Sequence, residues 1–207
     1  DPTPTPSNPT VTGTWQLVAS PDPQGGTLSG IVAVSATDLW AVGTVASNTS
    51  HNTTLIEHSD GATWHIVSSP NPNPSQTGDA LNAVAAISAN DVWAVGTDGT
   101  GTLIEHWNGA AWSAIPSPSP SSTGNYLYGV TAIGSDNVWA AGYDITGQGC
   151  GQIPEPLIEH WNGSQWSVAP TPTISVPYGA RLYAISADAA NDVWAVGDVV
   201  ERFDGSA

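Results

Sequence analysis

Acidic residues stand next to histidines three times in this chain, and such carboxylate–imidazole pairs could serve as acid and base or hold a metal ion. The pairs are Glu57-His58, Glu105-His106 and Glu159-His160, and Glu201-Arg202 occupies a fourth related position. Each pair lies in a stretch with strand character, where neighbouring side chains point to opposite faces. The two residues therefore cannot share a site within one strand. We predict a structural role, with the carboxylate accepting backbone or Trp N–H bonds; a ring of metal ligands is the alternative.

Other residue patterns that carry chemistry are incomplete. No Gly-x-Ser-x-Gly turn presents a serine nucleophile, and the glycines occupy turn positions in a chain without lysine, so phosphate loops are not expected. A recurring column of acidic or amide residues is of the type that folds its side chain onto nearby amides to hold a turn, with calcium binding as the alternative. Its members are Asp38, Asp91, Asn137 and Asp192. We expect no catalytic residue, no cofactor and no metal site.

The chain is built from four copies of one repeat. Four segments, each starting with Leu and ending with Gly, align without a gap: residues 28–43, 81–96, 127–142 and 182–197. Each has a Trp twelve residues after the Leu, namely Trp40, Trp93, Trp139 and Trp194. A second block follows each segment and reads LIEHSDGATW, LIEHWNGAAW, LIEHWNGSQW and VVERFDGSA. A recurring register of this kind indicates a repeat architecture.

Each repeat predicts four short strands. In the first repeat these are residues 31–35, 39–42, 55–58 and 64–67, which alternate apolar and small residues or form apolar β-prone runs. Asp-Gly or Asn-Gly pairs, such as Asp60-Gly61, stand between the third and fourth strands and predict type I′ hairpins. Four strands at a period of about 48 residues predict an all-β, four-bladed β-propeller of four-stranded antiparallel blades. A parallel β-helix is the minor alternative.

The strings LNAVAAISANDVWAVG and LIEHSDGATW resemble the propeller repeats of the Asp-box and photosystem-assembly-factor type, which also occur in sialidases and sortilin-like receptors. The likeness covers nearly the whole chain after residue 14. It implies a fold and no function, because such repeats occur in enzymes, receptors and assembly factors alike. The copies depart from a full Asp-box, since no extra residue separates the Asp from the Gly. Sialidase chemistry needs several arginines to grip a carboxylate, and the chain has only Arg181 and Arg202.

The two ends of the repeat array each contain part of a blade. Thr14, Trp15, Gln16, Leu17 and Val18 match the Trp-bearing fourth strand of the other repeats, whereas Val199, Val200, Glu201, Arg202 and Phe203 match a third strand. The N-terminal strand could complete the last blade within the chain and close the ring. It could instead complete the last blade of a neighbouring molecule and build a filament head to tail. A fragment of a larger propeller is the third interpretation.

Residues 1–13, beginning DPTPTPSNPT, are predicted to form a Pro/Thr-rich linker, and residues 14–207 the propeller. Two insertions between the second and third strands, residues 44–54 and 143–156, are the best candidates for a recognition surface because function tends to sit in irregular loops. Trp107 and Trp161, beside hairpin turns, vary between repeats and are candidate ligand contacts on carbohydrate, with packing between blades as the alternative.

Three triplets starting at Asn48, Asn52 and Asn162 are permissive for N-glycosylation. Cys150 lies in the second insertion between two glycines, so it could pair with another molecule or remain an idle thiol.

The net charge and composition of the chain limit the classes of partner that it can bind. The formal charge of −16 repels nucleic acid and anionic membranes. Charged residues make up only 10% of the chain, and the hydroxyl-rich remainder suits an extracellular or cell-surface protein. We therefore expect a non-enzymatic structural or adhesive propeller whose partner is another copy of itself. The alternative is a closed, lectin-like or protein-binding module that recognises an extracellular glycan or protein through the two insertions.

Overall fold

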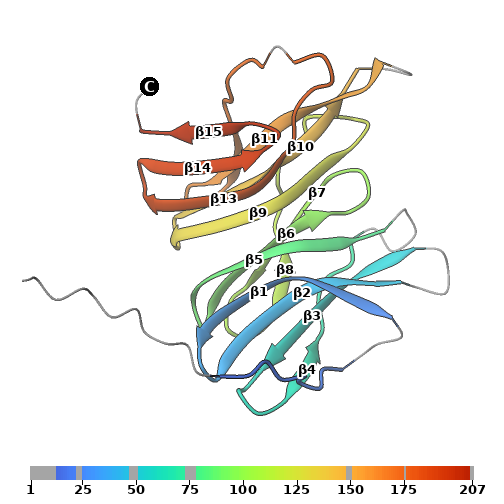
Figure 1. Ribbon diagram of the computed structural model, residues 1–207, viewed down its shortest axis with the longest axis vertical. Coiled ribbons are helices and arrows are strands. Elements are labelled where there is room, and N and C mark those ends of the chain that lie inside the picture. The colour runs from blue at the N-terminus through green and yellow to red at the C-terminus, as the bar shows by residue number, and fades with distance from the viewer. Residues whose placement is uncertain are drawn as a thin grey trace, which may run out of the picture.

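The computed structural model describes residues 13–21, 25–46, 51–72, 78–147, 151–174 and 176–205, and its strands form four antiparallel sheets (Figure 1). Sheet 1 consists of β1 (Gly26–Ser35), β2 (Asp38–Ala46), β3 (Asn52–Ser59) and β4 (Trp64–Val67). Sheet 2 consists of β5 (Ala80–Ser88), β6 (Asp91–Thr97), β7 (Thr102–Trp107) and β8 (Trp112–Ala114). Sheet 3 consists of β9 (Asn125–Gly134), β10 (Asn137–Thr146), β11 (Ile153–Trp161) and β12 (Trp166–Ala169). Sheet 4 consists of β13 (Leu182–Ala189), β14 (Asp192–Gly197) and β15 (Val200–Phe203).

Each sheet is a meander in which strands pair in chain order. The four repeats share one register, with Trp40 opposite His58 in sheet 1 and Trp194 opposite Arg202 in sheet 4. Several strands extend beyond the predicted runs because pairing continues into flanking polar residues, as far as Thr146 opposite Ile153 in sheet 3. No helix among the described residues is long and apolar enough to cross a membrane.

The predicted hairpins between third and fourth strands are present in sheets 1, 2 and 3, but their turn type differs from the prediction. Ser59 pairs with Trp64, which leaves four residues in the loop instead of the two of a type I′ turn. The Asp60 side chain accepts hydrogen bonds from the backbone amides of Ala62 and Thr63, at 2.9 and 2.8 Å. Gly61 has φ of 87°, which explains the glycine at this position. The Asx-type turn therefore takes the place of the predicted one.

Consecutive sheets pack face to face through the Trp columns. We call the face of a sheet that meets the following sheet its forward face, and the opposite face its rear face. Between sheets 1 and 2, Trp40, Val42 and Ile56 of the forward face cluster with Leu81 and Trp112 of the rear face. Equivalent residues form the clusters between sheets 2 and 3 and between sheets 3 and 4. Aromatic and branched side chains from two sheets thus make one core per sheet pair.

The first strands of all four sheets surround one groove. β1, β5, β9 and β13 each carry a β-bulge, at Ser29, Asn82, Tyr128 and Tyr183, where the register with the second strand skips one residue. The same four residues line a groove of about 270 Å³. Sheets arranged around a common axis by their first strands are the geometry of β-propeller repeats, which confirms the predicted type of fold.

The predicted closure of the ring within one chain is not found. In Figure 1 the sheets follow one another along the long axis, with sheet 1 at one end and β15 at the other. Residues 13–21, which we call the Trp15 segment, lie at the end occupied by sheet 1 and form no strand. Trp15 and Leu17 are fully exposed. Sheet 4 as described has three strands, because the segment expected to complete it lies at the far end of the molecule.

Candidate functional site

The recurring acidic or amide column contacts the His column in sheets 1 to 3 and the Trp column in sheets 2 to 4, and does not hold the turn as predicted. In sheet 1 the indole nitrogen of Trp40 has no hydrogen-bond partner among the described residues. In sheet 2, the Asp91 carboxylate accepts the indole N–H of Trp93 at 3.0 Å, and the same oxygen lies 2.9 Å from Nε2 of His106. The His106 ring lies 4.2 Å from the Trp93 ring, centroid to centroid. Asn137, Trp139 and His160 repeat this arrangement in sheet 3, so it is a packing unit of the repeat.

In sheet 4, Arg202 stands where the other sheets have histidine. Its Nε donates to the Asp192 carboxylate at 2.9 Å, and its guanidinium carbon lies 5.1 Å from the Trp194 ring centroid. The planar guanidinium thus takes the place of the imidazole over the indole.

In the Glu column, Glu105, Glu159 and Glu201 lie between consecutive sheets, and Glu57 is buried on the rear face of sheet 1. Glu105 and Glu159 are fully buried, and burial raises the pKa of each to about 8. The Asp79 charge contributes to the raised pKa of Glu105. The predicted hydrogen bonds are not made by Glu105, whose two carboxyl oxygens have no such partner among the described residues. A carboxyl group enclosed in this way cannot meet a substrate, since no solvent reaches it.

Within the described ranges, no three His, Cys, Asp or Glu side chains gather as metal ligands. The imidazoles of the His column are already engaged by Asp or Asn and by Trp rings. Glu and His of each pair lie on opposite faces, as expected, because Glu105 belongs to the buried rear face whereas His106 packs on forward-face Trp93.

Trp107 and Trp161 are half-buried and take part in the packing between sheets. The Trp107 ring lies 4.9 Å from the Trp40 ring, and its N–H donates to the carbonyl of Ala89 at 3.1 Å. Trp161 repeats this against Trp93, with its N–H donated to Ser135. This geometry favours the packing alternative, and carbohydrate contact by these two residues stays a prediction.

Two of the three sequon residues, Asn52 and Asn162, lie among the described residues. Asn52 begins β3 and is exposed, and Asn162 is exposed in the hairpin loop of sheet 3, where its side-chain oxygen accepts from the amides of Ser164 and Gln165. Asn48 and Cys150 lie outside the described residues. Glycosylation stays a prediction.

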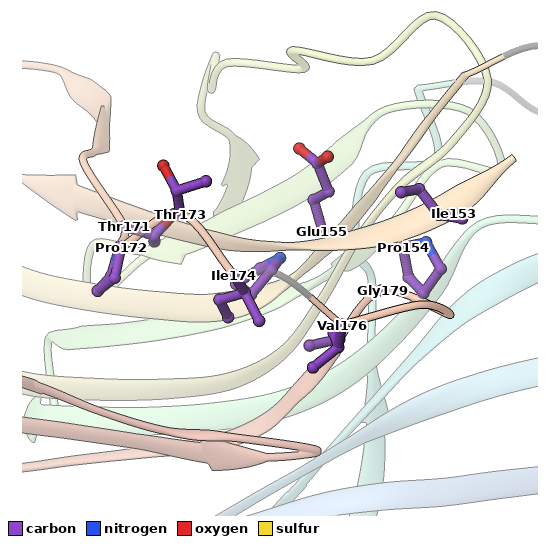
Figure 2. Close-up of a pocket in the computed structure, with 11 residues that line it drawn as sticks. Ile153, Pro154, Glu155, Thr171, Pro172, Thr173, Ile174, Val176 and Gly179 are labelled. Carbon is purple, nitrogen blue, oxygen red and sulfur yellow. The ribbon is translucent and has the colours of Figure 1, made fainter.

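The second insertion borders a cavity of about 220 Å³. Figure 2 shows that its lining comes from two segments, Ile153 to Glu155 on β11 and the connection from Thr171 to Gly179 that leads to sheet 4. Gly179 is pressed against this strand, since a Cβ there would lie 2.0 Å from the Pro154 carbonyl oxygen. The lining offers prolines, aliphatic groups, threonine hydroxyls and the carboxylate of Glu155, a set that suits binding better than catalysis.

A second cavity, of about 300 Å³, opens between sheets 3 and 4 beside β15, and we call it the acceptor cavity. Its apolar lining includes Trp139, Ile158, Ala169, Val193, Ala195 and Phe203. The equivalent residues two sheet pairs earlier surround Trp112, the first residue of β8. The Trp112 ring meets Trp40 edge-on at 5.3 Å. The acceptor cavity therefore corresponds to the space that the Trp of the fourth strand fills in sheets 2 and 3.

A group of tyrosines at and beside the groove was not predicted from the sequence. Tyr126, Tyr128, Tyr143 and Tyr183 form a chain of ring contacts across sheets 3 and 4. The available signal was that these positions break the repeat, because sheets 1 and 2 hold small or polar residues in the same columns.

No family model and no curated protein matches the chain. Among solved structures, the chain is similar to one described as YCF48 bound to D1 peptide, with 14% sequence identity and a TM-score of 0.42. The match covers 88% of this chain and 68% of that chain. The likeness is one of overall fold only.

Proposed function

We propose that this protein is a non-enzymatic structural module of four propeller-type repeats that joins to further copies of itself head to tail. In this proposal the Trp15 segment of one molecule becomes the fourth strand of sheet 4 in the next molecule. The single observation that carries the proposal is the acceptor cavity, which has the lining of a Trp site, in a chain that also exposes an unpaired Trp in a matching sequence.

The edge of sheet 4 suits strand addition. In sheets 2 and 3 the fourth strand pairs with the third, as β8 pairs with β7, and its leading Trp fills the core between two sheets. β15 is the last strand of sheet 4. Added strands gain affinity from main-chain hydrogen bonds and specificity from alternate side chains, and here Trp15 and Leu17 would supply those side chains.

The exposed residues on the forward face of sheet 4 also favour another copy of the chain as the partner. Trp194 is 44% exposed, whereas Trp40, its equivalent in sheet 1, is 2% exposed. Val196 and Val200 of this face are also exposed, although their equivalents in sheets 1 and 2 are fully buried by a following sheet. At the other end of the array, Leu28 of sheet 1 is 42% exposed, whereas its three equivalents are fully buried. The forward face of sheet 4 is thus open to a partner, whereas on the rear face of sheet 1 the first-strand edge with Leu28 and Ile31 is exposed and Ala41 and Leu55 are already buried.

The number of residues between Trp15 and Leu28 is close to the number between the fourth-strand Trp of each repeat and the Leu of the next repeat. Trp15 precedes Leu28 by 13 residues, and the corresponding intervals from Trp64, Trp112 and Trp166 to the next repeat's Leu are 17, 15 and 16 residues. A molecule whose Trp15 segment completes sheet 4 of its neighbour therefore has a connection of similar length to bring its own sheet 1 onto that sheet. One neighbour supplies both the strand and the covering sheet.

The hydroxyl-rich composition with few cations leads us to propose an extracellular or cell-surface setting for this assembly. A head-to-tail contact forms a closed ring where the rotation between copies closes and a filament where it does not. Each copy carries a formal charge of −16, so repulsion opposes assembly and added salt favours it.

The test is the mass of the 207-residue chain, measured by light scattering on a size-exclusion column and by sedimentation at several concentrations. We expect the mass to rise with concentration and with salt. Trp15→Ala removes the donor and Val200→Arg blocks the forward face, so each variant alone should remain monomeric. Mixing the two variants leaves one intact donor and one intact acceptor, and this mixture should form a heterodimer.

Tyr178→Ala is the matched control, because Tyr178 is 87% exposed and lies away from the acceptor cavity and from the forward face of sheet 4. It should assemble as the unmodified chain does. A chain that stays monomeric at about 0.5 mM, or a Trp15→Ala variant that assembles equally well, would contradict the proposal.

A further inference from the structure

Four of the five tyrosines in the chain lie together, and we call them the tyrosine cluster. The Tyr126 and Tyr143 rings lie 5.1 Å apart, and Tyr143 stacks nearly parallel on Tyr128 at 5.7 Å with 11° between the planes. Tyr183 of sheet 4 meets Tyr128 edge-on at 5.7 Å. The rings of Tyr126, Tyr128 and Tyr143 are half-buried and Tyr183 is exposed, so the cluster offers aromatic surface to solvent.

The β-bulges direct part of this cluster toward the groove on the axis. Tyr128 and Tyr183 are the bulged residues of β9 and β13, and Ser29 and Asn82 are those of β1 and β5. All four line the same groove of about 270 Å³. Bulges re-aim a side chain relative to a regular strand, so four bulges at one column bring four different side chains to one place.

Charged and amide groups border the tyrosines. The guanidinium carbon of Arg181 lies 5.3 Å from the Tyr143 ring centroid, and the Asp198 carboxylate accepts the backbone N–H of Arg181 at 3.0 Å. Burial and the neighbouring tyrosines raise the pKa of the Tyr128 phenol, so that hydroxyl group stays neutral. Tyr128 and Tyr183 thus line the groove, and a cationic donor and an anionic acceptor lie beside the tyrosine cluster.

The fold does not need aromatic residues at these positions. The column of Tyr128 and Tyr183 holds Ser29 and Asn82 in sheets 1 and 2, and the column of Tyr143 holds Thr44 and Thr97. Sheets 1 and 2 pack around the same axis without them. The repeat fold alone therefore does not account for the aromatic rings.

We propose that the tyrosine cluster and the adjoining groove form a binding site for a neutral saccharide. A pyranose ring presents a C–H face that stacks on an aromatic face and a rim of hydroxyl groups that need planar donors and acceptors. Tyr183 and Tyr128 supply the rings, Arg181 the donor and Asp198 the acceptor. The formal charge of −16 disfavours acidic sugars. The equivalents of Asp198 in sheets 1 and 2, Thr44 and Thr97, donate hydrogen bonds to the following sheet, so Asp198 borders the self-assembly surface and the proposal is tested on the monomer.

The experiment titrates the full chain with cellobiose, maltose and lactose, followed by saturation-transfer NMR and calorimetry. We expect at least one disaccharide to bind, and Tyr183→Ala and Arg181→Ala each to weaken it about tenfold or more. Tyr178→Ala, which changes the one tyrosine outside the cluster, should bind normally. Thermal unfolding of each variant checks that it folds, and Tyr183→Phe, which keeps the ring, should retain most of the affinity.

The proposal is overturned if none of the three disaccharides binds with a Kd below about 10 mM, or if Tyr178→Ala weakens binding as much as Tyr183→Ala does. Preference for a glucuronate-containing disaccharide over the neutral ones would overturn the charge argument. Binding of a synthetic DPTPTPSNPT peptide in place of any sugar would assign the aromatic groove to proline-rich segments instead.

Discussion

The buried glutamates should make this protein less stable as the pH rises. Burial raises the pKa of Glu105 and of Glu159 from the ordinary value of 4.5 to about 8. Between these pH values the folded chain holds protons that the unfolded chain releases, so the free energy of unfolding falls with increasing pH. The decline begins near pH 4.5 and ends above pH 8. Replacing both residues by glutamine, Glu105→Gln with Glu159→Gln, should reduce this dependence, and the raised pKa values of Asp144 and Glu201 account for the part that remains.

The expected effect is large. The gap between pKa 4.5 and pKa 8 corresponds to a free energy of about 2 to 5 kcal/mol for each carboxyl group. The upper end is the full effect of burial, and relaxation of the site and entry of water reduce it. Domains of this size have a total stability of about 5 to 15 kcal/mol. The double glutamine variant should therefore unfold several degrees higher than the unmodified chain at pH 8 and differ little from it at pH 4.5.

The assay is urea unfolding followed by Trp fluorescence at pH 4.5, 6 and 8. The negative net charge also destabilises the protein at high pH, so the measurements are made in about 0.5 M NaCl, which screens surface charges far more than buried ones. Asp136→Asn is the control, because Asp136 is exposed and its replacement removes one carboxylate from the surface, whereas the double variant changes two buried groups. It should leave the slope of stability against pH unchanged.

Parallel curves for the double glutamine variant and the unmodified chain would refute the argument. That result would mean that water or a rearranged hydrogen bond keeps the two carboxylates charged in the folded state. A steeper decline in the variant would contradict even the sign.

Three further changes test the fold. Trp112→Ala empties the core between sheets 1 and 2 and should lower the free energy of unfolding by about 3 to 5 kcal/mol, measured by urea unfolding. Gly96→Ala brings a Cβ to within 1.9 Å of the Ala80 carbonyl oxygen and should prevent native folding, seen as loss of the folded NMR spectrum, whereas Gly134→Ala, with its nearest atom at 3.4 Å, should fold. Burial lowers the pKa of His160, and Asn137→Asp should raise it by about one unit or more by placing a carboxylate 3.0 Å from Nε2, as an NMR titration would show.

The number of repeats, the strands of sheets 1 to 3 and the positions of their hairpins could be predicted from the sequence. These features are local, since strand character depends on alternation along the chain and the Asp-Gly and Asn-Gly pairs mark turns directly. The packing of Trp40, Trp93 and Trp139 between sheets also followed from the sequence, because a large apolar residue in the same column of every repeat needs a neighbouring repeat to cover it.

How the columns meet across sheets depends on the tertiary structure. It assigned Asp91 to the Trp and His side chains, enclosed Glu105 without a hydrogen-bond partner among the described residues, and gathered four tyrosines from two sheets. It also located the Trp15 segment and β15 at opposite ends of the molecule, although their sequences fit each other. Whether two matching strands meet in one chain depends on the angle between successive sheets. That angle is set by the summed packing of side chains between sheets, which no local pattern of residues specifies.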